Sequence, residues 1–172
     1  MSTNNITRTT TPRASPSTRQ PLTRTSLLNT LQTLTTQIDT ILASLHRHHR
    51  TLTTSITQTQ SSIAFAARFN TILPSTELAH WTAQLGTIMR AMALCTAHRV
   101  QMQQIEKTVK DSGEGRWIED GEVGADMVDL GARWRTAARA QRVFLRRVGE
   151  LEGECGLEFK EGGEGEGFVV YN

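Results

Sequence analysis

The sequence predicts an all-α protein, in which a long helical hairpin is followed by a third helix in a three-helix bundle or coiled-coil arrangement. Three stretches carry an apolar residue every three or four positions, the spacing of a helix that packs along another helix. Pro74 and a glycine-containing turn at residues 111–115 separate these stretches. The chain has no apolar run near the ~18 residues that a membrane-spanning helix needs. The spacing of apolar residues and the helix-breaking residues therefore both predict three helices.

The first helix is predicted over residues 26–73, with Thr25 or Ser26 as the capping residue. Its apolar stripe consists of Leu27, Leu31, Leu34, Ile38, Ile41, Leu45, Leu52, Ile56 and Ile63. The polar segment His46–Arg50 interrupts this stripe, and the sequence does not decide whether the helix continues through it. Threonine is frequent here and lowers helix propensity, so this helix needs a packing partner.

The second helix is predicted over residues 76–110, because a hydroxyl cap at Ser75 or Thr76 is followed by Glu77 in the first turn. Its stripe consists of Leu78, Trp81, Leu85, Ile88, Met92, Cys95, Met102, Ile105 and Val109. Gly86 inside the helix favours a close approach of another helix there. The short connection makes the first two helices antiparallel neighbours.

The third helix is predicted over residues 121–152. Its stripe is the most regular of the three, with Gln141 as the one polar member: Val123, Met127, Leu130, Trp134, Ala137, Gln141, Phe144, Val148 and Leu151. The first helix is predicted to be longer than both others, so it either bends near its histidines or projects beyond them. We expect its first half to project, with a partner-facing seam of Leu31, Leu34, Ile38, Ile41 and Leu45.

Charge is unevenly distributed along the chain. Residues 1–110 hold eleven Lys and Arg against three acidic residues, whereas residues 111–172 hold eight against fourteen. We divide the chain into a disordered basic tail (1–24), a helical domain (25–152) and an acidic Gly/Glu-rich tail (153–172) that ends in an apolar tip. Thr11 and Ser15 each precede a proline and are candidate phosphorylation sites.

Two polar clusters are candidate sites. His46 and His49 share a helix face, but no Cys, Asp or Glu lies near enough in sequence to complete a metal site, so no metal ligand is assigned. Four arginines fall on the outer face of the third helix and could bind an anionic partner: Arg135, Arg139, Arg142 and Arg146. A solvated face is the simpler interpretation of this run. Cys95 falls in an apolar stripe and is expected to be a buried thiol.

No nucleotide-binding, metalloprotease or nucleophile motif stands in the chain, so we expect no catalytic residue, no cofactor and no small-molecule substrate. We expect a non-enzymatic scaffold or adaptor subunit whose partners are other helical proteins, with a hetero-oligomer favoured over a homo-oligomer. In design the predicted domain is similar to short helical subunits of kinetochore, transcription-coactivator and vesicle-tethering complexes, although no motif identifies a family. The alternative is a module that binds nucleic acid or acidic lipid through the Arg face and basic tail.

The expected location is intracellular, in the cytoplasm or nucleus. A mitochondrial transit peptide shares the Arg- and Ser/Thr-rich composition of the first residues, but Pro12, Pro16 and Pro21 break the amphipathic helix that it needs.

Overall fold

The computed structural model describes residues 22–73, 76–112 and 129–159. Within these ranges the chain forms three helices, α1 (Arg24–Ala67), α2 (Thr76–Asp111) and α3 (Leu130–Cys155). Helices make up 88% of the described residues, which contain no strand. The predicted all-α fold, with a helical hairpin and a third helix, is confirmed.

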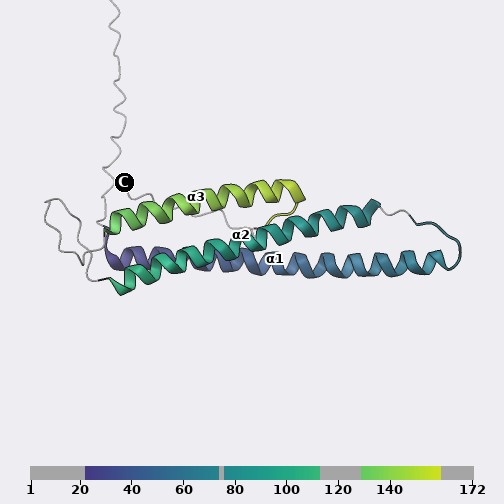
Figure 1. Ribbon diagram of the computed structural model, residues 1–172, viewed down its shortest axis with the longest axis horizontal. Helices are drawn as coiled ribbons and strands as arrows, with labels where there is room; N and C mark the ends of the chain where they lie inside the picture. Colours follow the sequence, from purple (N-terminus) through teal and green to yellow (C-terminus); the bar gives the residue numbers. More distant parts are fainter. Residues whose placement is uncertain (1–21, 74–75, 113–128, 160–172) are drawn as a thin grey trace, which may run out of the picture.

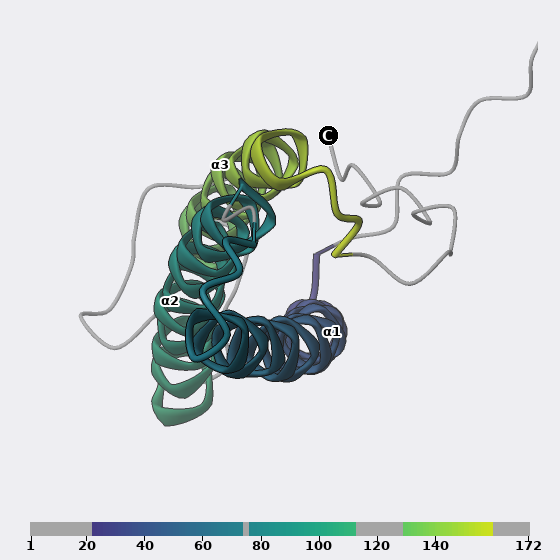
Figure 2. The ribbon, with the colours of Figure 1, turned by 90° about the vertical axis from the view of Figure 1, so that its right-hand side faces the viewer.

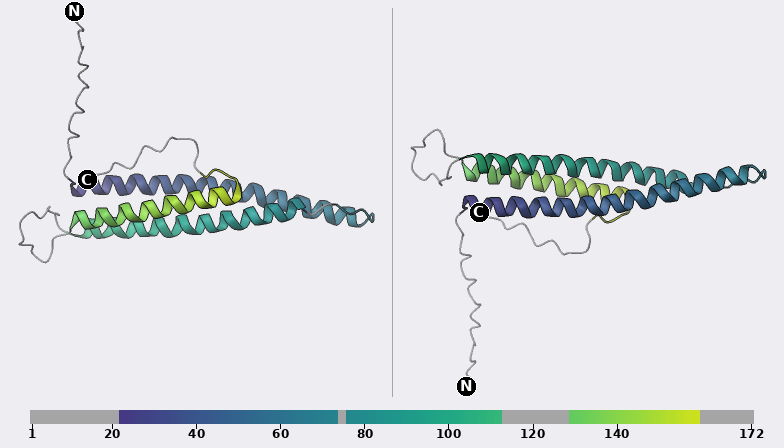
Figure 3. Two further views of the ribbon diagram at one scale, coloured as in Figure 1. Left: turned by 90° about the horizontal axis from the view of Figure 1, so that it is seen from above. Right: turned by 90° about the horizontal axis from the view of Figure 1, so that it is seen from below.

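The three helices lie side by side along one long axis (Figure 1). α1 and α2 run antiparallel and form the hairpin, while α3 runs in the same direction as α1. The end-on view of Figure 2 places α2 between the other two helices. α3 lies along the part of the hairpin that holds the start of α1, and the opposite end of the hairpin extends beyond it (Figure 3). This unequal length decides which surfaces the bundle leaves open.

The start of α1 is fixed by a capping box two or three residues before the expected cap. The hydroxyl of Thr23 accepts a hydrogen bond from the Ser26 amide at 3.1 Å, and the Ser26 hydroxyl accepts one from the Thr23 amide at 2.9 Å. The helix ends at Ala67, six residues earlier than predicted, and a turn with Asn70 at φ 55° follows it. Both ends of α1 differ from the predicted ends, because helix capping depends on local hydrogen bonds that the spacing of apolar residues does not specify.

α1 is continuous through His46–Arg50, which settles the question that the sequence left open. Threonine side chains along this helix bond back to the carbonyl four residues earlier, as Thr35 does to Leu31 at 2.9 Å and Thr53 does to His49 at 2.8 Å. The hydroxyls are thus satisfied within the helix, and the apolar stripe stays free to pack. Gly86 of α2 makes no close approach, because a Cβ built there would meet nothing within 4 Å.

The ends of α3 differ from the predicted ones. Asp129 is the N-cap in extended backbone, and its carboxylate accepts the Ala132 amide at 3.0 Å, so the helix begins nine residues after the predicted start at residue 121. Gly156 ends the helix at φ 66°, three residues beyond the predicted end at residue 152. The predicted stripe members Val123 and Met127 lie outside the described residues.

The chain beyond α3 also contributes to the core, contrary to the expected solvated tail. The Phe159 amide donates a hydrogen bond to the Glu152 carboxylate at 2.8 Å, and the Phe159 ring is fully buried. Most of the rest of the apolar core follows the predicted stripes, with members from all three helices: Leu27, Leu31, Leu34, Ile38, Ile41, Leu45, Ile88, Cys95, Met102, Ile105, Val109, Trp134, Ala137, Phe144 and Val148. One core thus joins the three helices wherever they overlap.

Candidate interaction surfaces

The seam expected to face a partner helix lies in the core of the chain itself. Its five residues are between 0% and 6% exposed: Leu31, Leu34, Ile38, Ile41 and Leu45. The expectation failed because α3 lies along the first half of α1, so the part that extends beyond the bundle is the second half. A substitution at Ile38 therefore tests the stability of the bundle rather than the binding of a partner.

The hairpin continues past the end of α3 as two helices without a third. We call this part the overhang and define it as residues 53–73 and 76–83. No residue of the overhang is buried among those that the structure describes, although it continues the apolar stripes of α1 and α2. The stripe residues Ile56, Ile63, Leu78 and Trp81 are only half-buried, whereas most stripe residues under α3, such as Ile38 and Ile88, are fully buried.

Further apolar side chains of the overhang are exposed near its tip. Phe65 and Phe69 are 62% and 67% exposed, and their ring centroids lie 5.0 Å apart. Ile72 is 95% exposed in the turn that follows α1. Large apolar side chains that gather at one end of a protein in this way are typical of an interaction surface.

Charged groups are almost absent from the overhang. Between residues 53 and 73 the only charged side chain is Arg68, and between residues 76 and 83 it is Glu77. Most of the remaining surface consists of Thr, Ser, Gln and Ala side chains. The overhang is therefore a nearly neutral surface, in contrast to the charged bundle.

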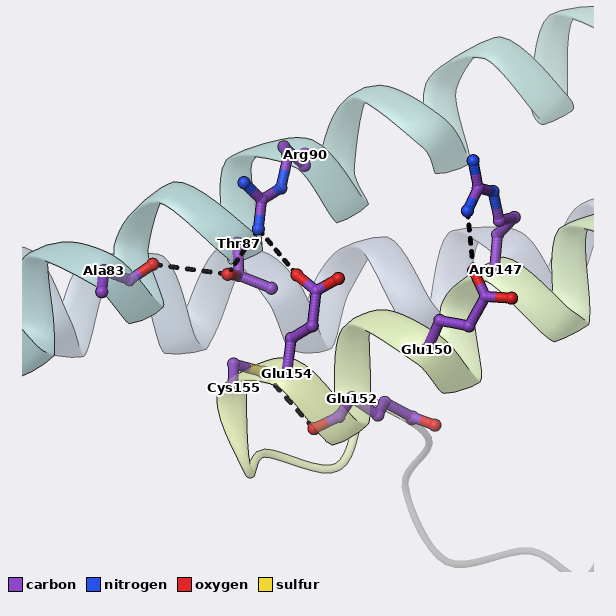
Figure 4. Close-up of polar contacts among 8 residues, drawn as sticks. All are labelled: Ala83, Thr87, Arg90, Arg147, Glu150, Glu152, Glu154 and Cys155. Atoms are coloured by element: carbon purple, nitrogen blue, oxygen red, sulfur yellow. Dashed lines mark hydrogen bonds and ion pairs between the residues drawn. The ribbon is translucent and has the colours of Figure 1, made fainter.

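Polar contacts fix the point at which α3 ends on the hairpin. The Gln84 side-chain amide donates to the Cys155 carbonyl at 2.8 Å, which satisfies one of the free carbonyls at the end of α3. Six residues further along α2, Arg90 reaches the Glu154 carboxylate at 2.7 Å and the Thr87 hydroxyl at 3.0 Å (Figure 4). These contacts mark the border between the three-helix bundle and the overhang.

The four arginines predicted for the outer face of α3 are all exposed. Arg135 pairs with Asp129 at 3.6 Å, and Arg146 pairs with Glu150 at 3.8 Å. Within the described part of the chain, Arg139 and Arg142 form no ion pair. Exposed ion pairs of this length contribute little to stability, so this arginine face stays available to an anionic group.

A shallow groove of about 420 Å³ lies between α2 and α3, with Leu94, Arg139 and Val143 among its lining residues. His98 and Phe144 also line it, and their rings are stacked with centroids 4.3 Å apart. His98 bonds to the side chain of the buried Gln141 at 2.7 Å. Burial lowers the pKa of His98, against the smaller opposing effect of its hydrogen bonds to side-chain amides.

Sequence reasoning missed His98, because it concentrated on the five adjacent residues His46–Arg50. In that cluster His46 is exposed and His48 and His49 are half-buried. Across the ranges that the structure describes, no group of three or more His, Cys, Asp or Glu side chains is placed to hold a metal ion. The signal for His98 was the gap in the predicted stripe of α2 between Cys95 and Met102, where His98 lies one helical turn after Cys95.

Cys95 is buried as expected, and Cys155 is buried as well; both are free thiols. Desolvation raises the pKa of Cys95 to about 11. Neither sulfur therefore has the exposed, anionic character of a reactive cysteine.

The candidate phosphorylation sites Thr11 and Ser15 lie outside the described residues, as does the apolar C-terminal tip at residues 167–172. None of the described helices combines the length and the hydropathy needed to cross a bilayer.

Comparisons with known proteins give no guide to these surfaces. No protein-family model matches the chain, and searches of curated proteins and of solved structures find no match. The function has to be argued from the surfaces themselves.

Proposed function

We propose that this protein is a non-enzymatic helical scaffold or adaptor subunit of a multiprotein complex, which acts by packing its helices against those of partner proteins. The overhang carries the proposal. A two-helix hairpin buries its apolar stripes poorly by itself, and a further helix is the usual element that covers them. The half-buried Ile56, Ile63 and Trp81 are the positions that such a helix would cover.

The distribution of burial supports a role for the overhang beyond stability. The bundle under α3 already holds a continuous core with residues at 0% exposure on every helix, including Ile38, Ile88 and Val148. The overhang adds little to that core, yet α1 and α2 continue as ordered helices through it. An extension that contributes few buried side chains and presents exposed aromatic rings fits a surface that binds another protein.

Affinity capture of the tagged chain from its native cell, at low and high salt, tests the proposal. We expect stoichiometric helical partners that remain bound at high salt, because an apolar interface depends little on ionic strength. The variant Phe65→Ser/Phe69→Ser should lose these partners, and Arg139→Ala should keep them. Both variants replace exposed side chains, so the fold tolerates them. Loss of the partners in Arg139→Ala alone would refute the proposal.

A second candidate function rests on the arginine face. Arg139 and Arg142 are exposed and, among the described residues, lack a carboxylate partner, so this face could bind nucleic acid or an acidic lipid surface. If all four arginines contact duplex phosphates, log K should fall with log salt at a slope of about −3 to −4. A titration of duplex DNA with the full chain at several salt concentrations separates this function from the scaffold.

A further inference from the structure

The arginine face of α3 holds two cations that no described carboxylate neutralises. Arg139 and Arg142 are exposed and form no ion pair within the described part of the chain. They stand three positions apart, so they are neighbours on the helix surface. The next carboxylate along α3, that of Glu150, is shared by Arg146 and Arg147 at 3.8 and 2.7 Å. An anionic group from elsewhere therefore fits this face.

The groove between α2 and α3 adjoins these cations. Arg139 and Val143 both line it and stand four positions apart, so their side chains are neighbours. Val143 is 49% exposed, and the half-buried Leu94 lines the groove from α2. A positive rim beside an apolar groove suits a peptide segment in which acidic residues are followed by apolar ones.

The chain carries a segment of this kind after its last described residue. We call residues 161–171 the tail segment. It begins with Glu161, Glu164 and Glu166, separated by glycines, and continues with an apolar run at residues 168–171. No Lys or Arg occurs within it. Its charge is opposite to that of the arginine face, and its apolar run follows the acids as the groove follows the arginines.

The point at which the bundle releases the chain puts the tail segment within reach of this surface. The Phe159 ring is buried and its amide bonds to the Glu152 carboxylate, so the chain leaves the bundle at the level of Glu152. Arg142 and Arg139 lie ten and thirteen residues before Glu152, about 15 and 20 Å along the helix axis. Seven residues of extended chain bring Glu166 up to about 23 Å from Phe159, and nine bring the first apolar residue up to about 30 Å. The excess over the axial distance lets the chain pass round α3, whose radius with side chains is about 5–6 Å.

We propose that the tail segment binds back onto the arginine face of its own chain, with its acidic residues at Arg139 and Arg142 and its apolar run in the groove beside Val143. The contact is independent of the proposed scaffold function, which depends on the overhang. It covers the arginine face, so a polyanion would have to displace the tail segment in order to bind there.

Two arguments favour the tail segment over other anionic occupants. Its attachment at Phe159 gives it an effective concentration on the order of millimolar at this surface, whereas an acidic peptide of another protein has to bind from solution. Nucleic acid would match the charge of Arg139 and Arg142, but its phosphates leave the apolar wall at Val143 and Leu94 uncovered.

Chemical modification of arginine side chains in the full chain tests the contact. With p-hydroxyphenylglyoxal as the reagent, peptide mass spectrometry gives the modification rate of each arginine. We expect Glu161→Gln/Glu164→Gln/Glu166→Gln to raise the rates of Arg139 and Arg142 at least about threefold. High salt should raise the same two rates in the unaltered chain, because it screens the ion pairs.

Two exposed arginines of the hairpin make the measurement specific. Arg68 follows the last residue of α1, beyond the end of α3, and its rate should stay unchanged. Arg50 is the competing site on α1. A faster reaction at Arg50 in place of Arg139 and Arg142 would put the tail segment on α1 and overturn the proposal. Unchanged rates at Arg139 and Arg142 would overturn it as well.

A second variant tests the groove separately from the charges. Phe168→Ser/Tyr171→Ser keeps every acidic residue of the tail segment, and it should also speed the modification of Arg139. If this variant reacts like the unaltered chain, the contact is purely electrostatic and the role of the groove is wrong.

Spin labels distinguish a contact within one chain from a contact between two chains. Gln101→Cys places a label on an exposed residue that lines the groove, and Asn172→Cys places one beside the tail segment. Both native cysteines are buried, which favours selective labelling. We expect a short distance that persists when the labelled chain is diluted into excess unlabelled chain. Loss of that distance on dilution would mean that the tail segment binds a second copy, and the proposal would be wrong.

Discussion

The Nε2 atom of His98 lies 2.7 Å from the side-chain oxygen of Gln141, in the interface between α2 and α3. Both residues are buried, and Phe144 stacks on the imidazole ring. Gln141 was the one polar member of the predicted α3 stripe, and this contact explains its place there: the amide satisfies a nitrogen of a buried imidazole ring. The pair also fixes the register of α3 on α2, because only one alignment brings the two side chains together.

The lowered pKa of His98 predicts that the protein loses stability in mild acid. The folded state disfavours the imidazolium, so the unfolded state binds more protons as the pH falls below the unfolded value of about 6.5. The free energy of unfolding should be constant above that pH and decrease below it. Below the folded-state pKa, His98 should cause no further decrease. Urea denaturation at a series of pH values measures this. His98→Leu should remove the part of the slope that belongs to this residue, and an unchanged slope would contradict the assignment.

Removing one member of the pair should cost more than removing both. Gln141→Leu leaves the His98 ring without its amide partner, and we expect a loss of about 1–3 kcal/mol of stability. The double variant His98→Leu/Gln141→Leu should recover part of that loss, since two apolar side chains need no hydrogen bond. A double-mutant cycle by urea denaturation checks the coupling, and additive effects of the two substitutions would show that the bond contributes nothing.

Truncation of an aromatic side chain should distinguish the bundle from the overhang. Trp134→Ala or Phe144→Ala removes a buried ring of the core and should cost about 3–5 kcal/mol. Phe65→Ala removes a ring that is 62% exposed and should change stability by about 0.5 kcal/mol or less. Thermal or urea unfolding at a protein concentration low enough to keep the chain monomeric makes the comparison. A large loss in Phe65→Ala would mean that the overhang belongs to the stabilising core.

Periodicity predicted the buried face of each helix well, because that face depends on neighbours three and four positions apart in the chain. Leu31 and Ile38 of α1, Ile88 of α2 and Phe144 of α3 were all placed on the correct face. The period does not say which helix covers a face. That depends on where each helix starts and ends, so the buried seam of α1 was assigned to a partner.

The start of α3 shows why helix ends were harder to predict than helix faces. Several acidic residues precede the helix, among them Asp120, Asp126 and Asp129, and each is a plausible cap by residue type. The structure selects Asp129, whose carboxylate reaches the Ala132 amide. His98 was missed for a related reason, since its role depends on a residue 43 positions away, on another helix.

Two glycine substitutions should act in opposite directions. Gly86 lies inside α2 with open space around its Cα, so Gly86→Ala should stabilise the protein by about 0.5–1 kcal/mol through helix propensity. Gly156 caps α3 at φ 66°, a conformation that an alanine adopts only with strain, so Gly156→Ala should destabilise it by about 1 kcal/mol. Differential scanning calorimetry measures both variants. A destabilised Gly86→Ala would mean that another helix does approach α2 at this point.

The two cysteines should react slowly in the folded protein. With a pKa of about 11, the Cys95 thiol has about a hundredfold smaller thiolate fraction at pH 8 than a thiol at the ordinary value of 9.0. Burial adds a steric barrier at Cys95 and Cys155 alike. Labelling by an alkylating reagent, followed by mass spectrometry, should therefore find both thiols unmodified in the native state and both modified in urea. Rapid labelling of Cys155 alone would show that the end of α3 opens from α2, since the Cys155 carbonyl is held there by Gln84.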